Sequence, residues 1–270
     1  MGFSVDSSGR VVETESKTER KIRRESSYRE TGILSIARVF GYMFIGLLIT
    51  AIVAVGLGVL FRYLIFKGAD ISSLSDDTFD QTSVNATIGF LVVMIACGIG
   101  VLVMGIVLNI SLYRGRSSLV APAIIYTVLM GGLLSSFTLF IEWSVLGLAF
   151  GITAGTFGIM ALIAFLSKGN LSGLAIAGIG LLIGALILSL VNWIIWLVSP
   201  TTWSVLYIAI QFIVLAAVML ITIYDMWRIK KIAERGEMNT NVELYCAFTL
   251  YVDFIYIFIR IVSVILASRR

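Results

Sequence analysis

Seven long apolar runs dominate this sequence and constrain its fold more than any other feature. Each run carries few charges and reaches about 20 residues, the length that an α-helix needs to cross the hydrocarbon core of a bilayer. A membrane β-barrel would instead alternate apolar and polar residues over shorter segments. The sequence therefore predicts an all-α integral membrane protein, a bundle of seven transmembrane helices. The predicted spans are 35–62, 87–111, 119–140, 144–166, 172–198, 203–226 and 244–266.

Charge separates the chain into two predicted regions. Of the 270 residues, 59% are hydrophobic and 13% are charged, whereas a soluble domain is about half apolar and about a quarter charged. Residues 1–32 are polar and rich in both signs of charge. We expect 1–32 to be a polar cytoplasmic tail, disordered or loosely helical, and 33–270 to be the seven-helix transmembrane domain. The apolar run after the tail is too long for the h-region of a signal peptide.

The distribution of Lys and Arg predicts the orientation in the membrane. The tail and the connections 112–118, 167–170 and 227–243 lie on one side and hold seven, two, one and four basic residues. The positive-inside rule places that side in the cytoplasm, so that seven spans put the C-terminus outside. Arg269 and Arg270 disagree with this, and six spans or a re-entrant last helix would resolve the conflict. Short connections and the lack of a targeting extension favour a bacterial plasma (inner) membrane.

Glycines recur at helical spacing in two of the predicted spans. Gly147, Gly151 and Gly155 are four residues apart, and Gly180 and Gly184 repeat the pattern in the next span. A stripe of small residues lets another helix approach closely. We expect these stripes to pack against neighbouring helices, while a mobile helix is the alternative.

Asp253 lies deep in the last apolar run. A charged side chain at the centre of a bilayer costs about 2.5–3.5 kcal/mol on insertion scales, and such residues are functional candidates by default. Arg38, Arg62 and Arg260 are near enough to span ends for their long side chains to reach the head groups. The aspartate side chain is too short to do so, which makes Asp253 the leading candidate for a functional residue.

Asp225, at the end of the sixth span, is the predicted partner of Asp253. Turn-forming residues cluster at Gly236, Asn239 and Asn241. A turn centred on Asn239 places both aspartates 14 residues away, at one depth, about 20 Å of helical rise from the turn. Two facing carboxylates would titrate as a coupled pair and could hold a proton, bind a cation such as Ca²⁺ or pair with an arginine. The alternative is an aspartate that only caps or hydrogen-bonds a neighbouring helix.

The residues around the two aspartates carry a family resemblance. Tyr224-Asp225 closes the sixth span, and Leu-Tyr-Val-Asp-Phe-Ile surrounds Asp253 at 250–255. This pattern resembles the C-terminal signature of the Bax-inhibitor-motif (transmembrane Bax inhibitor-like) family, in particular its bacterial members. The resemblance covers roughly residues 34–268. Supporting matches lie at 125–127, 131–132, 153–158 and 168–171.

The resemblance implies a fold, a function and roles for individual residues. It implies a seven-helix bundle with the last helix central between two three-helix layers, acting as a pH-sensitive calcium (cation) leak channel. The pH-sensing pair on the sixth and seventh helices matches Asp225 and Asp253, which would also contact calcium, the transported or bound ion. No cofactor is implied. An arginine at the cytoplasmic end of the second helix latches one aspartate; Arg116 and Arg114 bracket the matching position, which Gly115 occupies.

Two other classes of function stay open. The chain could be a regulator that transports nothing and acts by contact with a membrane-bound protease or with cell-death or stress machinery, docking through its tail. An intramembrane aspartyl protease also uses two aspartates on adjacent helices, but glycines do not precede Asp253 as they would in that class. A Ser–His dyad is excluded because the chain has no histidine. We therefore expect no enzyme and no nucleic-acid partner; the expected partners are the bilayer, calcium and another membrane protein.

Overall fold

The computed structural model describes residues 2–5, 11–14, 17–66, 81–114, 119–198 and 205–268. Seven helices in this part of the chain are long and apolar enough to cross a membrane, which confirms the predicted all-α seven-helix fold. A two-stranded antiparallel hairpin precedes them. The elements are β1 (Gly2–Val5), β2 (Val11–Thr14), α1 (Lys17–Phe66), α2 (Gln81–Arg114), α3 (Val120–Phe140), α4 (Trp143–Leu166), α5 (Ser172–Val198), α6 (Val205–Glu234) and α7 (Thr240–Ser268).

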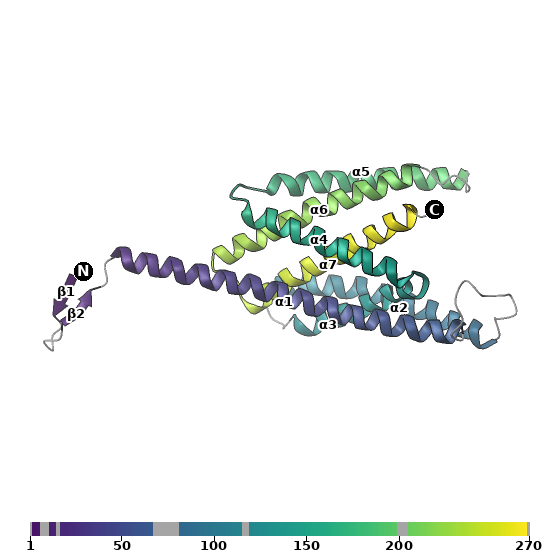
Figure 1. Ribbon diagram of the computed structural model, residues 1–270, viewed down its shortest axis with the longest axis horizontal. Helices are drawn as coiled ribbons and strands as arrows, with labels where there is room; N and C mark the ends of the chain where they lie inside the picture. The colour runs from purple at the N-terminus through teal and green to yellow at the C-terminus, as the bar shows by residue number, and fades with distance from the viewer. Residues whose placement is uncertain are drawn as a thin grey trace.

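The last helix lies at the centre of the bundle. Figure 1 shows α7 between one group formed by α1, α2 and α3 and another formed by α4, α5 and α6. It packs against α1, α4 and α6, and its Leu250, Ile257 and Val262 are fully buried. α7 is unbroken over 29 residues, roughly 43 Å of rise, so it is long enough for a full crossing and is not re-entrant in form.

The outer helices present apolar side chains to their surroundings. Leu102 on α2 is 70% exposed and Ile176 on α5 is 72% exposed. Extended apolar surface of this kind is unfavourable in water and is the ordinary face of a helix in lipid. The exposure pattern therefore agrees with a bundle embedded in a bilayer.

The first helix begins well before the first span. α1 starts at Lys17, whereas its membrane-length part starts at Gly32. From Lys17 onward the predicted tail is part of this helix, and Figure 1 shows this part of α1 projecting beyond the bundle. At Gly32 the helix meets α6, since a Cβ there would lie 3.1 Å from the carbonyl oxygen of Ala233.

A tight turn joins α6 to α7 and fixes their register. Gly236 adopts a φ of 71°, and the amides of Gly236 and Glu237 donate to carbonyls of the last turn of α6, which is a Schellman arrangement. The side-chain oxygen of Asn239 then accepts the amide of Val242 at 2.9 Å and caps α7. The turn therefore centres on Glu237, two residues before the predicted centre. We call this end of the bundle the hairpin end.

The predicted glycine stripes do not pack against another helix. Apart from the nearby backbone of the same helix, no described atom lies within 4 Å of a Cβ placed at any of the five positions, so both stripes face open space. The packing prediction is therefore wrong for the described part of the chain. The five positions are Gly147, Gly151, Gly155, Gly180 and Gly184.

Candidate functional site

Asp253 is buried near the middle of the central helix. It lies one residue from the midpoint of α7, its exposed fraction is 9%, and its carboxyl shares a hydrogen bond with Thr222 on α6. Its Oδ2 atom is buried and has no hydrogen-bond partner among the described residues. Because a buried polar atom without a partner is destabilising, this oxygen calls for a functional explanation.

Asp225 lies on α6, one helical turn nearer the hairpin end than Asp253. With the turn centred on Glu237, Asp225 is 12 residues before the centre and Asp253 is 16 residues after it. The prediction of equal depth is therefore corrected by about one turn, because α7 begins at Thr240, four residues before the predicted start of the last span. The two carboxyl groups remain close enough to interact electrostatically.

A cavity of about 250 Å³ with several polar side chains in its walls adjoins Asp225 at the hairpin end. Arg228, Glu237, Tyr245 and Thr249 contribute to its walls. The cavity gives Asp225 a polar surrounding that Asp253, one turn deeper, lacks. A cation or a proton that approaches the pair from this end would therefore reach Asp225 first.

Arg228 is the described cation nearest in sequence to the pair. It follows Asp225 by three residues on α6, so both side chains lie on one face of the helix, and the two groups interact electrostatically. The i, i+3 spacing of Asp225 and Arg228 is the sequence signal by which this residue could have been predicted. The proposed latch residues stay predictions: Arg116 lies outside the described residues, and the side chain of Arg114, the last residue of α2, does too.

Glu243 is a second buried carboxylate that the sequence analysis missed. It lies in the first turn of α7, its side chain is 2% exposed, and it forms an ion pair of 3.1 Å with Arg38 on α1. Arg38 also donates to the hydroxyl of Ser35 at 3.3 Å. The expectation that Arg38 reaches toward head groups is therefore replaced by a contact that ties α1 to the beginning of α7.

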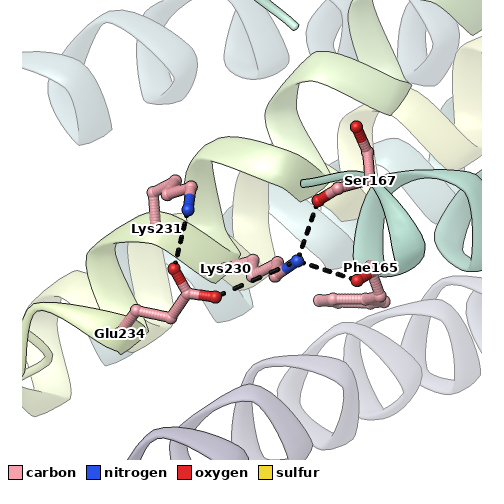
Figure 2. Close-up of polar contacts among 5 residues, drawn as sticks. All are labelled: Phe165, Ser167, Lys230, Lys231 and Glu234. Atoms are coloured by element: carbon pink, nitrogen blue, oxygen red, sulfur yellow. Dashed lines mark hydrogen bonds and ion pairs between the residues drawn. The ribbon is translucent and has the colours of Figure 1, made fainter. Parts of the chain in front are cut away.

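Lys230 holds α6 against the end of α4. Its Nζ donates to the carbonyl oxygens of Phe165 at 2.8 Å and Ser167 at 3.0 Å, and it lies 3.9 Å from Glu234, which also pairs with Lys231 (Figure 2). The last carbonyls of a helix have no partner within it and attract cations. Lys230 thus caps α4 from a neighbouring helix and fixes α6 five residues beyond Asp225.

Arg260 faces a buried partner in the half of the bundle away from the hairpin end. Its Nη1 donates to Oε1 of Gln211 on α6 at 2.6 Å, and Gln211 is only 6% exposed. We expected Arg260 to extend toward the head groups, but the structure directs its guanidinium at the α6–α7 interface.

The described residues contain no dense metal site. Nowhere among them do three His, Cys, Asp or Glu side chains gather as a ligand set. Calcium takes six to eight oxygen ligands, so two aspartates would supply only part of a coordination shell.

Comparison with known proteins gives a consistent result. The family model described as "Inhibitor of apoptosis-promoting Bax1" matches residues 34–270. The chain is 31% identical over 243 residues to the inner membrane protein YbhL of Escherichia coli (strain K12), covering 87% of this chain and 92% of that protein. It is also 31% identical over 187 residues to the uncharacterized protein RP147 of Rickettsia prowazekii, covering 66% of this chain and 76% of that protein. No solved structure matches.

Proposed function

Since the chain belongs to the Bax inhibitor-like family of membrane proteins, we propose that it is a pH-sensitive calcium (cation) leak channel gated by Asp225 and Asp253. The observation that carries this proposal is the Asp253 carboxyl, buried at the middle of a membrane-length helix with one oxygen lacking a partner. A purely structural aspartate would satisfy both oxygens. A gate must leave one oxygen free to take a proton or a cation.

The surroundings of Asp253 support a neutral carboxyl in this conformation. The side chain lies near the middle of a membrane-length helix with an exposed fraction of 9%, and its Oδ2 atom is buried without a hydrogen-bond partner among the described residues. A carboxylate in such surroundings would be far more costly than a protonated carboxyl. In our proposal this conformation is therefore the closed, neutral state.

Loss of that proton is the proposed opening step. In a low dielectric an ionised Asp253 repels the neighbouring Asp225 carboxylate and attracts cations. Between the aspartates and the Arg260–Gln211 contact the α6–α7 interface is apolar, with Ile257 buried in the core and Leu215 and Val218 packed against it. Such a dry segment blocks ions until the helices separate. Flux should therefore rise with pH.

Calcium flux into proteoliposomes between pH 6 and pH 8 tests the proposal. We expect wild-type flux to rise with pH and the double variant Asp225→Asn, Asp253→Asn to lose both the flux and its pH dependence. Glu234→Gln is the matched control, since it removes an acid from the same helix at a side chain that is 48% exposed. Wild-type flux and pH dependence in the double variant would refute the proposed mechanism.

We further propose a plasma (inner) membrane location with the N-terminus in the cytoplasm and the C-terminus outside. The name of the Escherichia coli relative and the basic connections at the hairpin end support this. Reporter fusions at both termini test it, and a cytoplasmic signal from the C-terminal fusion would overturn it.

Regulation by contact is a second candidate function, favoured by the shape of α1. Its first part, from Lys17 toward Gly32, projects beyond the bundle at the hairpin end (Figure 1). Such an element could dock on a membrane-bound protease or on stress machinery. Deletion of residues 2–30 should then remove the cellular phenotype and leave flux in proteoliposomes intact; loss of neither would exclude this function.

A further inference from the structure

We infer that Arg260, held in place by Gln211, is an electrostatic barrier that slows cations and discriminates against divalent ions along the α6–α7 interface. The inference rests on the proposed leak function and adds a residue that sets its rate and selectivity. It starts from the hydrogen bond of 2.6 Å between the guanidinium and a glutamine that is 94% buried.

The helix geometry places Arg260 beyond the aspartates on one path. Arg260 follows Asp253 by seven residues, almost two full turns, so both side chains lie on the same face of α7, about 10 Å apart along the axis. Their partners Thr222 and Gln211 both belong to α6. A cation that leaves Asp253 away from the hairpin end along this interface must therefore pass the guanidinium.

Arg260 also lies at a depth where its charge is strong. It is six residues from the midpoint of α7, about 9 Å, which falls inside a hydrocarbon core of about 30 Å if the helix is centred in it. No described carboxylate pairs with it, and the neutral Gln211 orients the charge without cancelling it. Positive groups at such positions exclude cations from other membrane pores.

The barrier has a signature that a packing role does not share. Coulomb energy is proportional to the charge of the passing ion, and rate depends exponentially on energy. The factor by which neutralising Arg260 raises Ca²⁺ flux should therefore be the square of the factor by which it raises K⁺ flux. For example, a rise of about threefold for K⁺ would go with a rise of about ninefold for Ca²⁺. A loosened bundle would raise both fluxes by the same factor.

Proteoliposomes loaded with Ca²⁺ or K⁺ indicators provide the test, at the pH of highest wild-type flux. We expect Arg260→Gln to raise Ca²⁺ flux about tenfold, with a much smaller rise for K⁺. Arg260→Lys should stay near wild type because it keeps the charge. Gln211→Leu releases the guanidinium from the interface and should also raise Ca²⁺ flux more than K⁺ flux. Lys231→Gln removes an equal charge at the hairpin end and is the matched control.

Several results would overturn the inference. An electrostatic barrier would be contradicted if Arg260→Gln raised Ca²⁺ flux and K⁺ flux by equal factors, or if it changed neither flux. It would also be contradicted if Lys231→Gln raised Ca²⁺ flux as much as Arg260→Gln does. Asp253→Asn separates this failure from that of the leak itself: if it abolishes flux while Arg260→Gln does nothing, only the barrier is refuted. Absence of flux from wild type and Arg260→Gln alike would refute both the barrier and the leak.

Discussion

The ion pair between Glu243 and Arg38 allows a quantitative prediction of stability, because the exposed fractions of its two side chains differ greatly. The Glu243 side chain is 2% exposed and that of Arg38 is 47% exposed, with 3.1 Å between Oε1 and Nη2. Replacing Arg38 by Gln leaves a buried carboxylate without its cation. Replacing Glu243 by Gln leaves a half-exposed guanidinium that water can solvate.

The magnitudes follow from that asymmetry. Coulomb's law gives about 5 kcal/mol for unit charges at this separation with an effective dielectric constant of about 20. Screening at the exposed Arg38 reduces the net value, because pairs at the surface contribute about 1 kcal/mol or less. A buried charge left unpaired costs about 3–5 kcal/mol. We therefore expect Arg38→Gln to lower the free energy of unfolding by about 3 kcal/mol. Glu243→Gln and the double variant should each lower it by about 1 kcal/mol.

Unfolding in mixed detergent micelles, followed by tryptophan fluorescence, measures these free energies. The double variant should recover about 2 kcal/mol relative to Arg38→Gln, because it no longer buries an unpaired charge. Lys231→Gln is the control, since its pair with Glu234 is exposed on both sides and should change stability by less than about 0.5 kcal/mol. Additive losses in the double variant, or equal losses in the two single variants, would refute the reasoning.

Two further predictions concern how the helices are held together. Lys230→Met removes the cation that caps α4 at Phe165 and Ser167, and should lower the free energy of unfolding by about 1–2 kcal/mol, as measured in the same unfolding assay. Gly131→Ala should lower it by about 1–3 kcal/mol, because the new Cβ would lie 2.7 Å from that of Val53, whereas Gly151→Ala has open space and should be neutral or slightly stabilising.

The membrane-spanning fold and the central aspartates could be predicted because they depend on local patterns. Span length follows from runs of apolar residues, and Asp253 stood out because nothing near it in sequence could relieve its charge. The depth of Asp253 in the bundle relative to that of Asp225 was predicted less well. Gly236 ends α6 through its positive φ, and Asn239 caps α7, so the turn lies earlier than a centre placed on Asn239 implies.

Contacts between residues far apart in the sequence could not be predicted from local patterns. Glu243 occupies the first turn of a helix, where an acid is ordinary, and nothing local indicates that Arg38 comes to it from α1. The glycines likewise show that local spacing does not predict which helices come into contact. The regular stripe on α4 has no neighbour, whereas a Cβ at Gly131 would lie 2.8 Å from the carbonyl oxygen of Thr50, which is a true close approach. Spacing identifies a smooth face of a helix but does not say which helix covers it.

These contacts also bear on where the bundle can open. At the hairpin end α6 and α7 are joined by a short capped turn, Lys230 ties α6 to α4, and Glu243 ties α7 to α1. In the other half Arg260 donates to the neutral Gln211 across the α6–α7 interface, and no turn joins the two helices there. Separation of the two helices around Asp253 should therefore begin from that half. Arg260 then lies at the point where the proposed ion path between α6 and α7 widens first. A fixed positive charge at that point limits the flux of cations most effectively.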